Sequence, residues 1–236
     1  VGHRPAENTL SVTVSESLLP VLPEVLARIK NLFDLYCEPK AVYETLQVMN
    51  TLQPGLCVLG TRLPGCFNVF EMSVRAVLGQ QITVKAASTL AAMLVAVYGT
   101  QVQTGIEGLT HSFPAPAAIL ALGENISEHL GKLGIISARA NTIYQLARVL
   151  ADEKNDFGFC GNPEEEMQKL QAIRGIGSWT AQYIAMRAMG WPDAFLPTDA
   201  GIKKALPDHT PKELQVLSEA WRPWRSYATV NLWNTL

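Results

Sequence analysis

The sequence predicts a mainly α-helical protein, α+β overall, in which a small N-terminal α/β segment precedes a body of about eight or nine helices, given typical helix and loop lengths. Residues 9–14 alternate apolar and polar side chains, as a half-buried strand does. Beyond residue 65, helix-start signatures recur while strand signals are faint. The 236 residues are 48% hydrophobic and 17% charged with a formal net charge of −2, which excludes a disordered or fibrous chain.

The first elements belong to the predicted α/β segment. After the strand, residues 24–35 repeat apolar side chains at helical spacing, namely Val25, Leu26, Ile29, Leu32 and Phe33. Residues 50–65 contain Pro54-Gly55, Gly60 and Pro64-Gly65, a density of turn residues typical of a connection. We therefore expect a strand, a helix and then a boundary between structural units.

Helix-start signals mark the elements of the helical body. Asn68 followed three residues later by Glu71 has the form of a capping box, before a helix with Val74, Val77 and Leu78 on one face. Residues 86–98 carry no charge but fall well short of the roughly 20 apolar residues that a bilayer span needs, so they predict a buried helix.

Three later starts follow the same logic. Pro114 and Pro116 begin another helix. Residues 162–165 (Asn-Pro-Glu-Glu) place a capping side chain, a first-turn proline and acidic residues at a helix N-terminus, where the helix dipole favours them. Residues 210–213 (Thr-Pro-Lys-Glu) repeat that signature.

Several kinds of site are disfavoured by cysteine and histidine usage. The four cysteines form no C-x-x-C pair and are predicted to be reduced, structural thiols: Cys37, Cys57, Cys66 and Cys160. The four histidines are isolated, with no G-x-S-x-G motif to suggest a Ser-His hydrolase: His3, His111, His129 and His209. We also expect no secretory signal, although the chain begins at Val1 and an upstream segment stays open.

The most informative stretch is residues 170–181, Leu-Gln-Ala-Ile-Arg-Gly-Ile-Gly-Ser-Trp-Thr-Ala, which ends one amphipathic helix and begins another. Gly175 and Gly177 can take positive φ and leave no side chain in the way, so backbone N–H groups at the second helix start can approach an anion. A Rossmann fingerprint needs a third glycine and a preceding strand, and a P-loop needs Gly-Lys-Ser/Thr; neither is present. The stretch predicts a phosphate-binding turn between two helices.

This turn resembles the helix-hairpin-helix of the DNA glycosylase superfamily, in which an aspartate follows the hairpin; here that is Asp199. Residues 195–199 (Phe-Leu-Pro-Thr-Asp), 221–228 (Trp-Arg-Pro-Trp-Arg-Ser-Tyr-Ala) and 231–233 (Asn-Leu-Trp) are similar to the bacterial 3-methyladenine DNA glycosylase II family. Upstream, residues 62–66 and 75–83 also match its pattern. The resemblance covers nearly the whole chain.

The resemblance implies a helix-hairpin-helix glycosylase body made of two helical subdomains. Residues 1–44 would form a partial N-terminal α/β domain, similar to the TATA-binding protein. Residues 69–191 would form one helical subdomain with the hairpin at its end, and 45–68 plus 192–236 a second that carries the aspartate. Relatives have a longer N-terminal domain, so a longer or fused parent protein stays open.

Asp199 is the residue that the resemblance makes catalytic. By composition alone, it reads as the cap of a helix beginning at Ala200, and the two roles are compatible. Cleavage of an N-glycosidic bond builds positive charge on the sugar, which a carboxylate stabilises, or else the carboxylate orients the attacking water. An alkylated purine is already cationic and leaves readily, so the general acid of a glycoside hydrolase is not obligatory.

Trp179, Tyr183 and Trp233 line the base pocket by resemblance, although such aromatic residues alone are more often core. An electron-rich ring attracts a cationic methylated base by roughly 0.5 to 2 kcal/mol. Glycosylases that also cut the strand carry a lysine for Schiff-base chemistry where this chain has Trp179. The tryptophan therefore implies a monofunctional enzyme.

The remaining predicted site residues contact DNA. Gln81, with Gln80 as the neighbouring candidate, fills the gap left by the flipped nucleotide, although some relatives use leucine there. The backbone N–H groups of Gly175, Gly177 and Thr180 hold phosphates, helped by three cationic side chains, Arg174, Lys203 and Arg225.

No cofactor is expected, and no metal held by side chains. No four-cysteine cluster follows Asp199, which argues against an iron–sulfur centre. The resemblance implies that a sodium or potassium ion can bind backbone carbonyls of the hairpin in DNA complexes.

The predicted function is base excision repair by a monofunctional DNA glycosylase that flips an alkylated purine, of the 3-methyladenine or 7-methylguanine type, and hydrolyses its N-glycosidic bond. Two alternatives stay open, namely a non-catalytic helix-hairpin-helix DNA-binding module and an 8-oxoguanine-type glycosylase/lyase. The expected partner is double-stranded DNA with alkylated bases and not a membrane. We expect a monomer in the bacterial cytoplasm, at the nucleoid.

Overall fold

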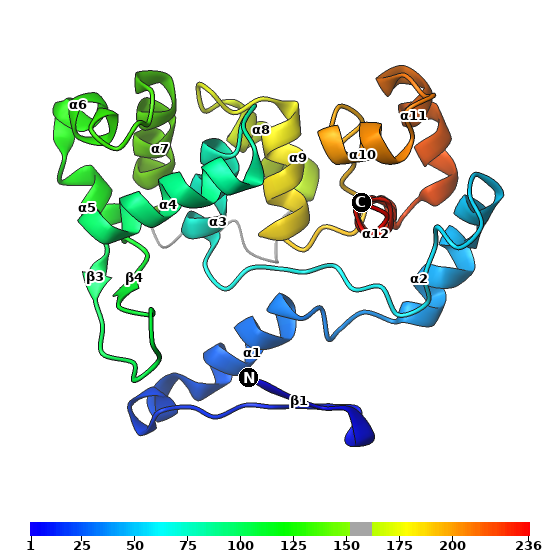
Figure 1. Cartoon of the computed structure of the whole chain (residues 1–236), viewed down its shortest axis with the longest axis horizontal. Coiled ribbons are helices and arrows are strands. Elements are labelled where there is room, and N and C mark those ends of the chain that lie inside the picture. The colour runs from blue at the N-terminus through cyan, green and yellow to red at the C-terminus, as the bar shows by residue number, and fades with distance from the viewer. Residues whose placement is uncertain (152–161) are drawn as a thin grey trace.

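The computed structural model describes residues 1–151 and 162–236 (Figure 1). Its first elements are a two-stranded antiparallel sheet, β1 (Gly2–Arg4) and β2 (Thr9–Ser11), in which His3 pairs with Leu10. The strand predicted over 9–14 is therefore shorter than expected. Helices α1 (Leu22–Leu32) and α2 (Pro39–Leu46) follow. The first of these ends before the predicted residue 35, because Asp34 takes a left-handed conformation with φ of 52°.

The helical body follows the turn-rich connection and is mainly α, as predicted. Its longer helices are α3 (Val69–Leu78), α4 (Val84–Tyr98), α7 (Ser137–Leu150), α8 (Pro163–Gln171), α9 (Ser178–Arg187) and α12 (Arg225–Trp233). Shorter ones are α5 (Pro116–Leu120), α6 (Ile126–Gly131), α10 (Ala200–Ala205) and α11 (Pro211–Leu217). The described part of the body thus has more α-helices than the predicted eight or nine, because several are only one or two turns long.

A second small sheet interrupts the helices. Strands β3 (Thr100–Gln101) and β4 (His111–Ser112) pair antiparallel, with Thr100 opposite Ser112. The sequence carries no hairpin dipeptide between alternating apolar runs here, so the prediction missed these strands of two residues each.

The helix starts follow the capping signals. Thr210 and Glu213 form a complete capping box, and the Asn162 side chain accepts from the N–H of Glu164. Asn68 accepts from the N–H of Glu71, but the Glu71 carboxylate pairs with Arg75 at 2.8 Å. The capping box predicted at Asn68 and Glu71 is therefore confirmed only at its N-cap residue.

The helix predicted over 86–98 is present as part of α4, but the prediction that it is buried is wrong. In α4, Ala91 and Leu94 are fully buried, whereas Val84 and Val97 are 85% and 57% exposed. The helix packs one face against the core, with Leu90 and Tyr98 half-buried beside it, and exposes the opposite face, which the absence of charge in the sequence did not reveal.

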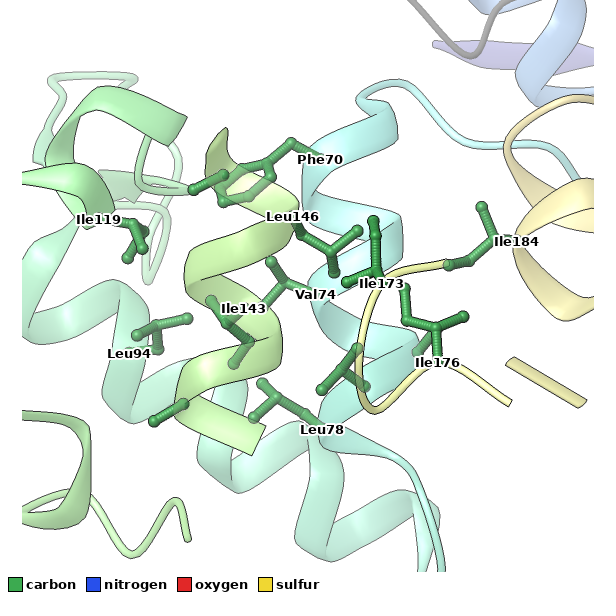
Figure 2. Packing of buried hydrophobic residues seen from close by; sticks show 14 of the residues in the cluster. Phe70, Val74, Leu78, Leu94, Ile119, Ile143, Leu146, Ile173, Ile176 and Ile184 are labelled. Atoms are coloured by element: carbon green, nitrogen blue, oxygen red, sulfur yellow. The ribbon is translucent and has the colours of Figure 1, made fainter. Parts of the chain in front are cut away.

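Two clusters of buried apolar side chains meet at α9. The first cluster packs α3 to α9 together; Figure 2 shows Val74, Ile143, Ile176 and Ile184 in it. The second joins α2 to α10, α11 and α12 and includes Ala185 and Met186 of α9. Successive residues of α9 thus bury toward different clusters, which fixes this helix between them. The three domain boundaries proposed from the resemblance remain predictions.

Among the described residues, Cys37, Cys57 and Cys66 are free thiols, and burial raises the pKa of the Cys66 thiol to about 11. Cys160 lies outside the described residues. None of the helices described for residues 1–151 and 162–236 combines the length and apolarity needed to cross a bilayer.

Candidate active site

Asp199 lies at the N-terminus of α10, where it is the N-cap residue. Its backbone is extended, with φ of −66° and ψ of 137°, and its Oδ1 accepts the N–H groups of Gly201 at 2.8 Å and Ile202 at 3.1 Å. The residue is only 8% exposed. The helix-capping role predicted for Asp199 is therefore compatible with the predicted catalytic role, because the cap holds the carboxylate in place at a helix start.

Two tryptophans from distant helices also donate to this carboxylate. The indole Nε1 of Trp179, on α9, donates to Oδ2 at 3.0 Å. The indole Nε1 of Trp233, at the end of α12, donates to Oδ1 at 2.8 Å. Oδ1 thus accepts three hydrogen bonds, whereas Oδ2 accepts one. All four contacts use the carboxylate as an acceptor, and Oδ2 is the oxygen with capacity left for a water molecule or a sugar.

The three predicted pocket aromatics gather around Asp199. The rings of Trp179 and Tyr183 stack with centroids 5.1 Å apart and an interplanar angle of 9°. The ring centroid of Trp233 lies 6.3 Å from that of Tyr183. The family resemblance predicts all three residues at the site but not the indole hydrogen bonds. No local signal could predict these, because they join positions 20 and 34 residues from Asp199.

Gly201 is a site residue that the sequence analysis missed. A Cβ atom there would lie 2.7 Å from Cδ1 and 2.9 Å from Nε1 of Trp233, and 3.0 Å from Oδ1 of Asp199. The absence of a side chain therefore lets the indole of Trp233 reach the carboxylate. The glycine directly after Asp199-Ala200 was the available signal.

The predicted hairpin connects α8 to α9, and its two glycines serve different purposes. Gly175 has φ of +96°, and a Cβ there would lie 2.0 Å from Oγ1 of Thr142 on α7. Gly177 has φ of −88° with no atom within 4 Å of a Cβ position. Only Gly175 uses the left-handed conformation, whereas Gly177 leaves the surface open.

The N-terminus of α9 is open. Gly177 is its N-cap and forms no side-chain cap hydrogen bond, so the first N–H groups of the helix lack the partner that a side chain usually supplies. Arg174, Gly175 and Gly177 are exposed, whereas Thr180 is buried. Lys203 is exposed on α10. Exposed amides and cations at a helix start are suited to a phosphate.

The two wedge candidates differ in their contacts. The Gln80 side-chain amide donates to the carbonyl of Gly175 and to Oγ1 of Thr180, both at 3.0 Å. Gln81 is exposed in the turn between α3 and α4, with a left-handed φ of 55°. Because Gln80 is already bonded to the hairpin, Gln81 is the stronger of the two candidates, and its insertion into DNA stays a prediction. An αL conformation at a non-glycine residue often marks a functional position.

The structure corrects the placement of Arg225. Its side chain is 7% exposed, and the guanidinium pairs with both carboxylate oxygens of Asp193, at 2.7 and 2.9 Å. It also donates to the Asp193 carbonyl at 2.9 Å. A buried, bidentate ion pair leaves no guanidinium face for a phosphate. Arg225 therefore joins the start of α12 to the segment before Asp199, an arrangement that the sequence did not reveal.

A cavity of about 200 Å³ among the described residues lies away from this site. It is lined by the N-terminal segment and the end of α9, including Asn31, Asp34, Arg187 and Met189. It contains none of the three predicted base-pocket residues. The base pocket at Trp179, Tyr183 and Trp233 therefore remains a prediction that rests on the aromatic cluster.

Comparison with known proteins gives the family. Residues 1–68 match the model of the AlkA N-terminal domain, and residues 74–225 match that of the HhH-GPD superfamily of base excision DNA repair proteins. The chain is 37% identical to DNA-3-methyladenine glycosylase 2 of Escherichia coli K12, over 98% of this chain and 78% of the relative.

Two further relatives show the range of contexts. A Mycobacterium tuberculosis protein, described as a probable bifunctional transcriptional activator/DNA repair enzyme AlkA, is 39% identical over 89% of this chain but only 42% of its own length. The 3-methyladenine DNA-glycosylase of Archaeoglobus fulgidus has the same fold, with a TM-score of 0.72 at 22% identity over 94% of this chain and 76% of that one. The chain belongs to the HhH-GPD superfamily of base excision DNA repair proteins.

Proposed function

We propose that this chain is a monofunctional DNA glycosylase that excises alkylated purines, of the 3-methyladenine and 7-methylguanine type, from double-stranded DNA. The observation that carries the proposal is the Asp199 carboxylate, held by four donors beside an open DNA-binding hairpin. The named activity of the Escherichia coli relative supports it. The substrate places the activity at the chromosome, in the bacterial cytoplasm.

Asp199 performs the proposed chemistry through Oδ2. As the N-glycosidic bond lengthens, positive charge develops on the sugar, and a carboxylate nearby lowers the energy of that state. Water then adds to the sugar, and its proton passes to bulk solvent or to the carboxylate. The alkylated base leaves as a neutral molecule because it was already cationic. No reagent other than water is consumed.

The aromatic cluster supplies the proposed selectivity. Trp179, Tyr183 and Trp233 place electron-rich rings around the carboxylate. A cationic methylated base is attracted to such faces by roughly 0.5 to 2 kcal/mol, whereas an unmodified base is not. Because Trp179 stands where a lyase would need an amine, the products are a free base and an intact abasic strand.

A sodium or potassium ion at the hairpin is a separate proposal. Backbone carbonyl oxygens are suitable ligands for these ions, and in the hairpin turn at residues 172–177 all residues except Ile173 and Ile176 are exposed. Binding of the same duplex in sodium, potassium and tetramethylammonium chloride at equal ionic strength tests it. Equal affinity in all three salts would argue against an ion in the hairpin.

Base release from methylated duplex DNA tests the proposed function. We expect the wild-type chain to release 3-methyladenine or 7-methylguanine, resolved by chromatography, and Asp199→Asn to release neither at a comparable rate. Borohydride should trap no covalent complex. Retention of DNA binding with no base release by the wild type would instead favour the non-catalytic module, and a borohydride-trapped complex on 8-oxoguanine DNA would favour the lyase.

A further inference from the structure

The turn that carries Gln81 and the hairpin that carries Gly175 are far apart in the sequence but share direct contacts. The Gln80 side-chain amide donates to the Gly175 carbonyl and to the Thr180 hydroxyl, each at 3.0 Å. These bonds join the α3–α4 turn to both the hairpin turn and the first turn of α9. One amide therefore links the two segments proposed to contact a damaged duplex. The turn with Gln81 (the wedge turn) would contact the gap left by the flipped nucleotide, and the hairpin would contact phosphates.

Helix α7 contacts both the α3–α4 turn and the hairpin turn. The Arg139 guanidinium donates to the main-chain carbonyl of Gln80. Three residues later on the same helix face, Thr142 donates to the Arg174 carbonyl at 3.0 Å. The hairpin can approach Thr142 this closely because Gly175 has no side chain. One helix face therefore holds both the wedge turn and the hairpin.

From these contacts we infer that Gln80 is a positioning residue that couples insertion of Gln81 to binding of phosphates at the hairpin. The inference rests on the proposed function, because it assigns Gln80 a part in flipping the damaged nucleotide. Gln80 contacts neither the base nor Asp199. Its amide fixes the distance between the wedge and the hairpin, so that DNA held by the hairpin meets a Gln81 side chain already in place. Such preorganisation removes an ordering cost from binding.

The chemistry of the contact makes the role specific to an amide. Nε2 is the donor in both bonds, and both partners act as acceptors. A Gln80→Glu variant would place a carboxylate against the Gly175 carbonyl, and Gln80→Met keeps the length of the side chain without a donor. Thr180→Val removes one acceptor and leaves Gln80 in place.

A mutant cycle with DNA binding as its readout tests the coupling. The variants are Gln80→Met, Gln81→Ala and the double variant, with Gln103→Met as the matched control at an exposed glutamine. Affinity is measured by fluorescence anisotropy for an undamaged duplex and for one with a tetrahydrofuran abasic analogue. Melting temperatures identify any variant that does not fold, in which case Thr180→Val replaces Gln80→Met in the cycle.

We expect Gln80→Met to weaken binding of the abasic duplex on the order of tenfold, the effect of losing donors to two acceptors. Binding of the undamaged duplex, which needs no wedge, should change far less. The Gln81→Ala effect should shrink in the Gln80→Met background. Equal loss on both duplexes, additive effects of the two substitutions, or affinities matching Gln103→Met would each overturn the coupling. Because these duplexes need no excision, the result is separate from a failure of the proposed function.

Discussion

Helices α9 and α10 begin in opposite ways, although their N-cap residues are only 22 positions apart. The N-terminus of α10 is closed by the Asp199 carboxylate, which accepts two of its N–H groups. The N-terminus of α9 begins at Gly177, with no side-chain cap and with an exposed surface. A closed helix start holds an internal anion for chemistry, whereas an open one is available to an external anion such as a phosphate.

Substitutions of Asp199 separate its capping role from its proposed catalytic role. Asn caps a helix about as well as Asp but cannot accept the Trp179 N–H at the Oδ2 position, so Asp199→Asn should lower the free energy of unfolding by about 1 kcal/mol while the single-turnover excision rate falls by about 10³-fold or more. Asp199→Ala should additionally lower the free energy of unfolding by about 1 kcal/mol. Asp208→Asn, at an exposed aspartate, is the control. Excision by Asp199→Asn at close to the wild-type rate would contradict a catalytic carboxylate.

Alanine substitutions at the two hairpin glycines, Gly175 and Gly177, should differ in their effect on stability. Gly175→Ala meets both a positive φ and the Thr142 hydroxyl, so the free energy of unfolding should fall by about 1 to 3 kcal/mol, with loss of DNA affinity. Position 177 has space for a methyl group and an ordinary φ, so Gly177→Ala should lower the free energy of unfolding by less than about 1 kcal/mol. Urea unfolding of both variants measures the difference. Equal stabilities would show that the hairpin does not need its left-handed residue.

Gly201→Ala tests whether Trp233 must reach the carboxylate at the closed helix. The added methyl group would displace the indole, so the excision rate should fall on the order of tenfold, as expected for the loss of one hydrogen bond to a charged group. DNA affinity should stay near that of the wild type. Gly131→Ala, where a Cβ meets no atom within 4 Å, is the matched control. An unchanged excision rate would indicate that Trp179 alone suffices.

The smallest effect concerns the cations around the open helix. Arg174→Ala should weaken binding of damaged and undamaged duplexes alike and reduce the slope of log affinity against log salt by about 1. Arg225→Met should leave that slope unchanged, because Arg225 is paired with Asp193. It should instead destabilise the fold, since the buried Asp193 loses its buried partner and keeps only the half-exposed Arg222. A salt slope reduced by Arg225→Met would restore Arg225 to the DNA surface.

Features that depend on neighbours within one helical turn could be predicted from the sequence. The caps at Asn162 and Thr210 and the glycine-bearing hairpin needed only residues a few positions apart, as did Asp199 at a helix start. The resemblance across nearly the whole chain added the family and the aromatic residues near Asp199. The exposed face of α4 was mispredicted, because composition does not say which apolar side chains find a partner.

The tertiary structure alone decided the contacts between distant segments. Packing of α9 and α12 brings two indoles to Asp199, and packing of α3 and α7 brings Gln80 to the hairpin. Packing also buried Arg225, which its sequence context favoured as a DNA contact. Local hydrogen bonds at a cap depend on backbone torsions that a few residues encode. Contacts between side chains that are tens of residues apart depend instead on how whole helices pack. No local pattern of residues encodes that packing.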